Sequence, residues 1–145
     1  MIPKKIIVHH SLTKDDETVS WGAIRRYHIN TLGWVDIGYH AGVELIKSGG
    51  QSRHEALIGR NWGFRGAHTL DQNHDSLGIC FVGNYDLEEP SGEILEIGAG
   101  VIKMWLWLFG ISPDEIYGHR HFSGKSCPGE KFNMEKLVAI VKFKR

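Results

Sequence analysis

The stretch that decides the fold is residues 76–83, SLGICFVG, a nearly continuous run of apolar residues. A strand that is buried on both faces has this composition, whereas a strand with one face in water alternates apolar and polar residues. We therefore predict that this run is a central strand of the sheet.

Shorter strand patterns flank this run along the chain. KKIIVHH (4–10) is a β-branched run that ends at two histidines, and EIYGH (115–119) is a second short strand pattern. HAGVELI (40–46) and RHEALI (53–58) are separated by KSGGQS (47–52), whose glycines suit a turn. We predict that the last two segments form a strand pair.

Three segments have the apolar spacing of helices: 20–32, 91–109 and 133–143. The first and third begin with a serine and an asparagine, which favour N-caps, and Gly33 and Gly110 end the first two. The order of elements predicts an α/β fold, a central mixed β-sheet flanked by helices. We expect one domain over residues 1–145, without a separate wall-binding domain.

Composition argues against two classes of partner. Lysine plus arginine number 17 and aspartate plus glutamate also 17, so no net positive field would attract nucleic acid or a membrane surface. The most apolar stretch, VIKMWLWLFG (101–110), is shorter than the roughly 20 residues of a membrane span. The apolar run of residues 6–8 is too short for a signal peptide, so we expect cytoplasmic synthesis. With only two cysteines, a reducing compartment is the simpler interpretation.

One glycine-bounded segment, GHRHFSGKSCPG (118–129), contains His119, His121, Lys125 and Cys127. A catalytic zinc takes three nitrogen or sulfur ligands and keeps a fourth position open. A histidine at the end of the first strand would complete such a set. The spacing matches no common zinc-finger motif, and the alternative is a buried thiol between surface imidazoles. Lys125 favours the metal, because it places a cation where an oxyanion would develop.

The remaining histidines divide by position. His28 lies within a predicted helix, and His54 and His74 lie in polar surroundings, so we expect packing or solvation for these three. The others lie at strand ends or in glycine-rich loops, where sites in α/β proteins gather. They are His9, His10, His40, His68, His119 and His121.

The motif H-x5-K-x-C-P, which ends at Pro128, resembles the zinc-dependent N-acetylmuramoyl-L-alanine amidases of the type-2 amidase and peptidoglycan recognition protein superfamily. It is most similar to the phage lysozyme-amidases. Four further stretches agree in order: IIVHHS, IRRYH, GWVDIGYH and GAHTLDQNHDSLGICFVGN. The resemblance extends from about Ile6 to Phe132, and it implies the type-2 amidase fold.

The resemblance also implies a set of site residues. His9, His119 and Cys127 would bind Zn²⁺, and Tyr39 and Lys125 would be catalytic. The residues expected to line the substrate groove or to support it from behind are His40, His68 and Asn73.

Two look-alike histidines and Cys80 are expected outside this set. His10 and His121 should lie outside the metal shell. Some branches of the superfamily have a glutamate base at the position of Cys80, so a glutamate base is not expected here. An unpaired cysteine in an apolar strand behaves as a small hydrophobe, and we predict a packed core thiol.

The implied reaction is hydrolysis of the amide between N-acetylmuramic acid and L-alanine by zinc-activated water. Lys125 would stabilise the oxyanion, and Tyr39 would orient the water or donate a proton. We expect the protein to be a monomer and its partner to be bacterial peptidoglycan, recognised through the peptide stem and glycan. NWGFRGAHT (61–69) is the expected contact loop. We expect the protein to be a phage or prophage endolysin that acts on the cell wall after its release. The resemblance also implies a phage RNA polymerase as a further partner.

Two other functions remain open. Many peptidoglycan recognition proteins keep the fold but lack the zinc thiolate, and they bind muropeptides without cleaving them; the presence of Cys127 favours catalysis. A cysteine peptidase would use Cys127 as a nucleophile with a histidine as its base, and would work without metal.

Overall fold

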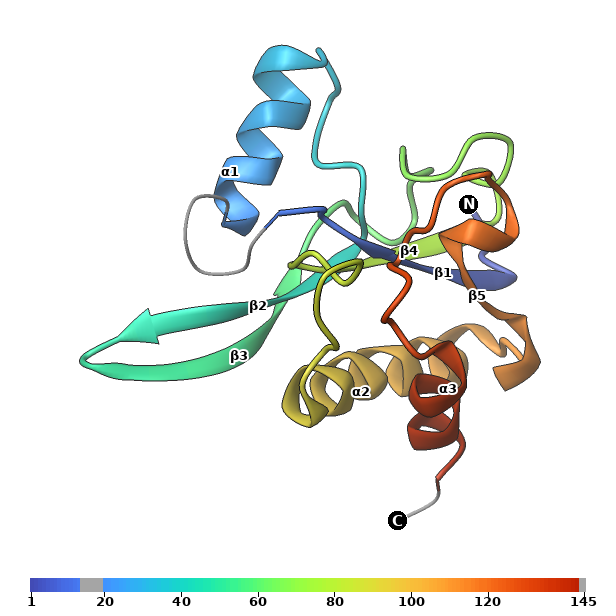
Figure 1. Ribbon diagram of the computed structural model, residues 1–145. Coiled ribbons are helices and arrows are strands. Elements are labelled where there is room, and N and C mark those ends of the chain that lie inside the picture. Colours follow the sequence, from blue (N-terminus) through green and yellow to red (C-terminus); the bar gives the residue numbers. More distant parts are fainter. Residues whose placement is uncertain (14–19, 144–145) are drawn as a thin grey trace.

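A computed structural model describes residues 1–13 and 20–143. Its sheet has five strands in the order β3-β2-β4-β1-β5 (Figure 1). β4 lies at the centre, parallel to β1 and β2, and β5 is parallel to β1, whereas β2 and β3 form an antiparallel hairpin. The bounds are β1 Lys5–His10, β2 Ala41–Ser48, β3 Gln51–Ile58, β4 Ser76–Phe81 and β5 Ile116–Gly118.

The buried run predicted to be a central strand is β4, and all six of its residues are buried. Its side chains divide between two clusters. Leu77, Ile79 and Phe81 pack in the cluster that contains Trp105, whereas Cys80 packs in another with residues of the first helix. Cys80 is a fully buried core thiol, as expected. Both faces of β4 are therefore covered, which explains why its sequence does not alternate.

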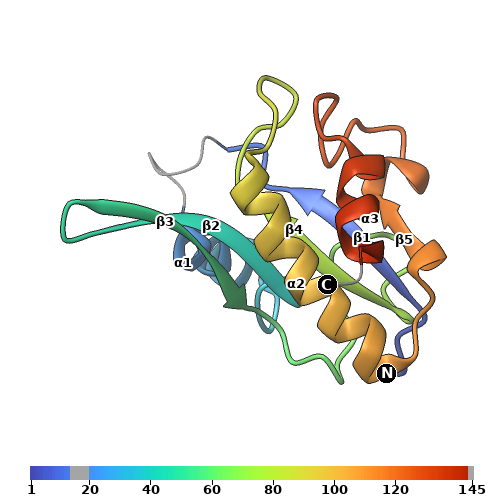
Figure 2. The same cartoon turned by 90° about the horizontal axis from the view of Figure 1, so that it is seen from below.

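Helices cover the two faces unequally. α2 (Gly92–Phe109) and α3 (Met134–Lys142) lie on one face, and Figure 2 shows them in front of the sheet with α1 (Trp21–Arg26) behind it. Short 3-10 turns occupy Pro113–Glu115 and His119–His121.

The helix ends follow from the predicted caps. The Ser20 and Asn133 side chains accept hydrogen bonds from the backbones of Ala23 and Lys136. Gly110 adopts the left-handed conformation that ends α2.

The predicted helix over residues 20–32 differs in one respect. α1 ends at Arg26, and Tyr27–Thr31 form a π-helical turn. The His28 ring lies buried in this turn, where its Nδ1 accepts the Gly38 N–H at 3.0 Å. This tertiary hydrogen bond lies outside what helical periodicity can predict.

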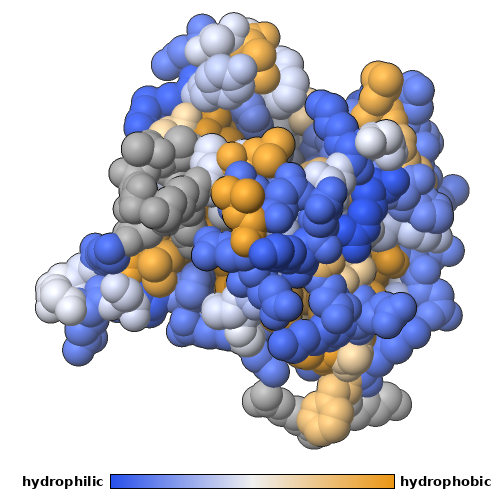
Figure 3. All heavy atoms as spheres, in the orientation of Figure 1, coloured by the Kyte–Doolittle hydropathy of each residue, from blue (hydrophilic) through white to orange (hydrophobic). Residues whose placement is uncertain are grey.

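The surface is mainly polar on the face seen in Figure 3, where hydrophobic side chains form small groups among hydrophilic ones. Within residues 1–13 and 20–143, no helix is both long enough and apolar enough to cross a membrane.

Two glycines of α2 give a matched test of this packing. A Cβ on Gly98 would overlap the buried Phe81 ring, whereas a Cβ on Gly100 would meet no neighbouring atom. We expect Gly100→Ala to stabilise the protein by about 0.5–1 kcal/mol through helix propensity. Gly98→Ala should destabilise it by roughly 1–3 kcal/mol through overpacking. Urea denaturation measures both, and equal stability of the two variants would contradict this packing.

Candidate metal centre and active site

His9, His119 and Cys127 lie together, with their ligand atoms all within 4.8 Å of one another. The sheet topology brings the two histidines together. Val8 pairs with Gly118 in the parallel strands β1 and β5, and the residues that follow this pair are His9 and His119. The His9 and His119 ring centroids are 4.6 Å apart, and His9 Nδ1 is 3.8 Å from Cys127 Sγ. This cluster could hold a metal ion.

The loop that carries Cys127 is held by Arg120. The Arg120 backbone N–H donates to the Cys127 carbonyl at 2.6 Å, and its guanidinium donates to the carbonyls of Gly129 (2.7 Å) and Phe132 (3.1 Å). The sulfur itself accepts the His10 backbone N–H at 3.5 Å. A backbone donor of this kind stabilises a thiolate.

Burial sets the protonation of the three candidate ligands. It lowers the pKa of His9 well below its usual value, aided by His68 and His119. It also lowers the pKa of His119, with Lys125 as the second cause. Both imidazoles are therefore neutral at pH 7 and keep a lone pair for a metal.

Cys127 responds in the opposite sense. Burial raises the pKa of its thiol to about 11, despite the charges of Lys125 and Arg120, so the thiol stays protonated when no metal ion is bound. A bound divalent cation would offset that burial and deprotonate the thiol. Two imidazole nitrogens and one sulfur are a donor set that suits zinc. The residues present therefore fit the metal that the sequence predicts.

The ring of Tyr39 lies beside this cluster, with its centroid 5.2 Å from that of His9. Burial, followed by the nearby Cys80 and Cys127, raises the pKa of Tyr39 well above its usual value, and its hydroxyl hydrogen-bonds the Cys80 side chain. The phenol therefore stays protonated at neutral pH and can act as a donor.

Lys125 lies exposed on the loop between His119 and Cys127. Its charge acts on His119, whose pKa it lowers after the larger effect of burial. The site thus combines neutral imidazoles, a protonated phenol and an exposed cationic side chain at one edge of the sheet.

His68 lies directly against a candidate ligand. Its Nδ1 is 3.0 Å from His9 Nε2, and burial, then the neighbouring His40, lowers its pKa to about 3. Asn73 Oδ1 accepts the backbone N–H groups of His68 and Thr69, both at 2.9 Å. Substrate contacts by His68 and Asn73 stay predictions, whereas these contacts within the protein were not anticipated from the sequence.

His40 lies behind the site and is fully buried. Its Nδ1 accepts the Gly78 N–H at 3.0 Å, and its Nε2 donates to the Phe64 carbonyl at 2.9 Å. Both ring nitrogens are thus engaged within the protein, so any effect of His40 on substrate is indirect.

The two look-alike histidines have other neighbours. His10 Nδ1 accepts the Tyr85 N–H at 3.1 Å, and the His121 ring packs on Tyr117 and Phe122 at centroid distances of 4.8 Å. Among the residues that the structure describes, neither belongs to the cluster that could hold a metal. Side-chain alternation along β1 separates His10 from His9.

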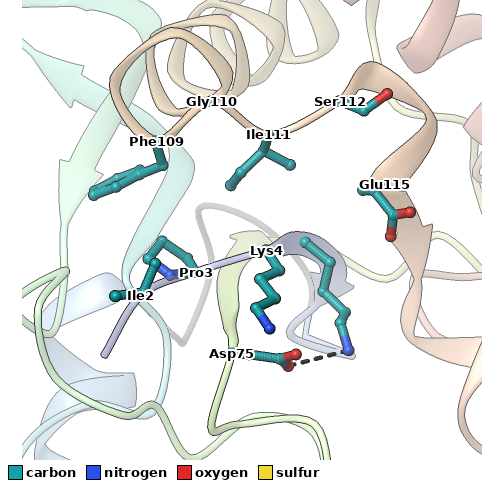
Figure 4. Close-up of a pocket in the computed structure, with 10 residues that line it drawn as sticks. Ile2, Pro3, Lys4, Asp75, Phe109, Gly110, Ile111, Ser112 and Glu115 are labelled. Carbon is teal, nitrogen blue, oxygen red and sulfur yellow. Dashed lines mark ion pairs between the residues drawn. The ribbon is translucent and has the colours of Figure 1, made fainter.

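A separate pocket lies where β1 begins, away from the histidines at its end (Figure 4). Its residues include Lys4, Phe109 and Glu115, and an ion pair joins Lys5 to Asp75 at 3.0 Å. None of its lining residues is a histidine or cysteine. This pocket is therefore distinct from the candidate metal site of His9, His119 and Cys127.

Comparison with known proteins identifies the family to which this fold belongs. Residues 1–130 match the Amidase_2 family model, described as N-acetylmuramoyl-L-alanine amidase. Peptidoglycan-recognition protein SC2 of Drosophila melanogaster is 32% identical over 129 residues, which cover 85% of this chain and 66% of that protein. The N-acetylmuramoyl-L-alanine amidase of Sus scrofa is 35% identical over 115 residues, 77% of this chain but 18% of that protein.

Solved structures show the same architecture. The amidase LysC from Clostridium intestinale superposes with a TM-score of 0.79 at 24% identity, covering 99% of this chain and 87% of LysC. Bumblebee PGRP-SA superposes with a TM-score of 0.75 at 29% identity, covering 93% and 81%. This chain spans just under two thirds of the Drosophila relative. Together with the family match, these likenesses establish that the chain belongs to the N-acetylmuramoyl-L-alanine amidase (Amidase_2) family, within the type-2 amidase and peptidoglycan recognition protein superfamily.

Proposed function

We propose that this chain is a zinc-dependent amidase that hydrolyses the bond between N-acetylmuramic acid and L-alanine in peptidoglycan. The observation that carries the proposal is the cluster of His9, His119 and Cys127, with all ligand atoms within 4.8 Å. It occurs in a chain whose family is described by this activity.

The three clustered residues would hold the metal. When bound, zinc supplies Lewis-acid activation of water and of the scissile carbonyl. The parallel pairing of β1 with β5 fixes the two histidines, and Arg120 fixes the loop that carries the sulfur. These supports hold the ligands before any metal arrives.

Two further side chains are suited to the charge changes of amide hydrolysis. The protonated Tyr39 hydroxyl can orient the attacking water or donate to the leaving amine. The Lys125 ammonium supplies positive charge for the developing oxyanion. Because Lys125 is exposed, it can move toward a bound substrate.

Peptidoglycan is the proposed substrate, since the relatives are named as amidases and as peptidoglycan recognition proteins. The exposed Phe64, in the loop expected to contact the stem or glycan, suits such a contact. Action as a phage or prophage endolysin, as a monomer, stays a prediction. So does the phage RNA polymerase partner.

The two cysteines give a matched test. We expect wild type to bind about one zinc per chain and to release L-alanine amino termini from purified peptidoglycan. Cys127→Ala should lose both, whereas Cys80→Ala should keep the zinc, because Cys80 is not part of the cluster. Zinc content and new amino termini are measured on the same preparations.

Each alternative function predicts a different result. Zinc binding without cleavage would indicate a recognition protein, as in the names of several relatives. Cleavage that survives prolonged chelation would contradict the zinc mechanism and favour Cys127 as a nucleophile.

Tyr39→Phe and Lys125→Ala test the two catalytic assignments. Each should reduce kcat by roughly 10²–10⁴-fold, typical of a lost acid–base or oxyanion-stabilising group. Zinc content should stay near that of wild type, because neither residue is in the cluster. A variant with wild-type kcat, or one that loses its zinc, would contradict that residue's assignment.

A further inference from the structure

His68 has a contact that the proposed ligand set does not explain. We propose that His68 is a positioning residue: it accepts a hydrogen bond from His9 Nε2 and so leaves His9 Nδ1 free to bind the metal. This inference rests on the proposed function for its purpose, but its geometry can be tested separately.

The two ring nitrogens of His9 face different neighbours. Nδ1 faces Cys127 Sγ at 3.8 Å, toward the metal cluster. Nε2 faces His68 Nδ1 at 3.0 Å and Thr69 Oγ1 at 3.3 Å. A neutral imidazole carries one N–H, and only the nitrogen without it can bind a metal. The ligand geometry therefore requires the His9 proton on Nε2.

The direction of the hydrogen bonds beyond His68 agrees with this requirement. The Ser76 hydroxyl donates to the Gln72 carbonyl at 2.7 Å, and a carbonyl can only accept. Ser76 Oγ is then available as an acceptor for His68 Nε2, at 3.5 Å. With its proton on Nε2, His68 has a free Nδ1 that accepts from His9.

Thr69 extends the same pattern. Its Oγ1 lies 3.0 Å from His68 Nδ1 and 3.3 Å from His9 Nε2. The hydroxyl can accept from His9 while it donates to His68. The Thr69 contacts are thus compatible with this tautomer of each ring.

Backbone contacts fix the His68 ring in place. Asn73 Oδ1 accepts the N–H groups of both His68 and Thr69. The ring packs on the central strand at Gly78, where any Cβ would overlap it. Gly78 thus makes room for His68 on the same face of the sheet as His9, whose register partner is Cys80.

This arrangement has a known chemical purpose. A metal-binding histidine commonly donates its other N–H to an acceptor that fixes its tautomer and raises its basicity. Carboxylates and backbone carbonyls usually serve, and here a second imidazole takes that place. Loss of such an acceptor typically costs about 10–100-fold in metal affinity.

Two substitutions at one position separate the hydrogen bond from the shape of the ring. His68→Phe keeps a ring but removes the acceptor, and His68→Gln keeps a side-chain oxygen that can accept. We expect H68F to weaken zinc affinity by about 10–100-fold and H68Q to recover most of the loss. Competition with a chromogenic chelator measures affinity, and His74→Gln, at an exposed histidine nearby, is the unchanged control.

Nitrogen NMR of the metal-free protein supplies a second readout. Long-range ¹H–¹⁵N correlations should place the His9 proton on Nε2 in wild type and on a mixture of both nitrogens in H68F. A folded H68F with wild-type affinity and an unchanged His9 tautomer overturns the inference, as does an H68Q no better than H68F. If H68F does not fold, the other two measurements decide. A His9 proton on Nδ1 in wild type overturns the inference, and a His9 proton on Nε2 together with near-wild-type zinc affinity in H68Q supports it.

The outcomes also separate this inference from the proposed function. If wild type binds zinc and H68F binds it more weakly, but wild type releases no L-alanine amino termini, the amidase proposal fails and the positioning role of His68 stands. Zinc-dependent cleavage with no effect of H68F on affinity or tautomer leaves the amidase intact and overturns the positioning role.

Discussion

The parallel pairing of β1 with both β4 and β5 is the constraint on which the rest of the structure depends. Parallel strands bring their carboxyl ends to one edge of the sheet, and residues that follow them meet there. His9 is the penultimate residue of β1 and pairs with Cys80 of β4, and His119 follows β5. The two histidines are 110 residues apart along the chain, yet their rings are 4.6 Å apart.

Burial gives this edge its chemistry. Burial, complete for His9 and partial for His119, keeps both imidazoles neutral, and burial raises the pKa of Cys127 to about 11. Uncharged ligands can be buried at modest cost, whereas a buried thiolate needs a cation beside it. Burial also raises the pKa of the Tyr39 phenol, which keeps it protonated. A metal with charge +2 would therefore satisfy the site electrostatically as well as by its donor atoms.

Most of the fold could be predicted from the sequence because its patterns are local. The buried run at 76–81, the caps of α2 and α3 and the glycine turn between β2 and β3 all hold in the structure. The π-helical turn at Tyr27–Thr31 could not be predicted, because it accompanies a tertiary hydrogen bond of His28.

The candidate site was harder to predict from residue patterns alone. The spacing from His119 to Cys127 is no general metal signature, so the resemblance to a family carried the ligand set. Alternation along β1 distinguishes His9 from His10 only once the faces of the sheet are known. The contact of His68 with His9 depends on how a loop packs over Gly78, which no local pattern encodes.

X-ray absorption at the zinc edge of the metal-loaded protein tests the central claim most directly. A site built from His9, His119 and Cys127 predicts one sulfur at about 2.3 Å and two nitrogens at about 2.0–2.1 Å, with one oxygen from water in the fourth position. A first shell without sulfur, or one with two sulfurs, would contradict the assignment of these three residues as the metal ligands.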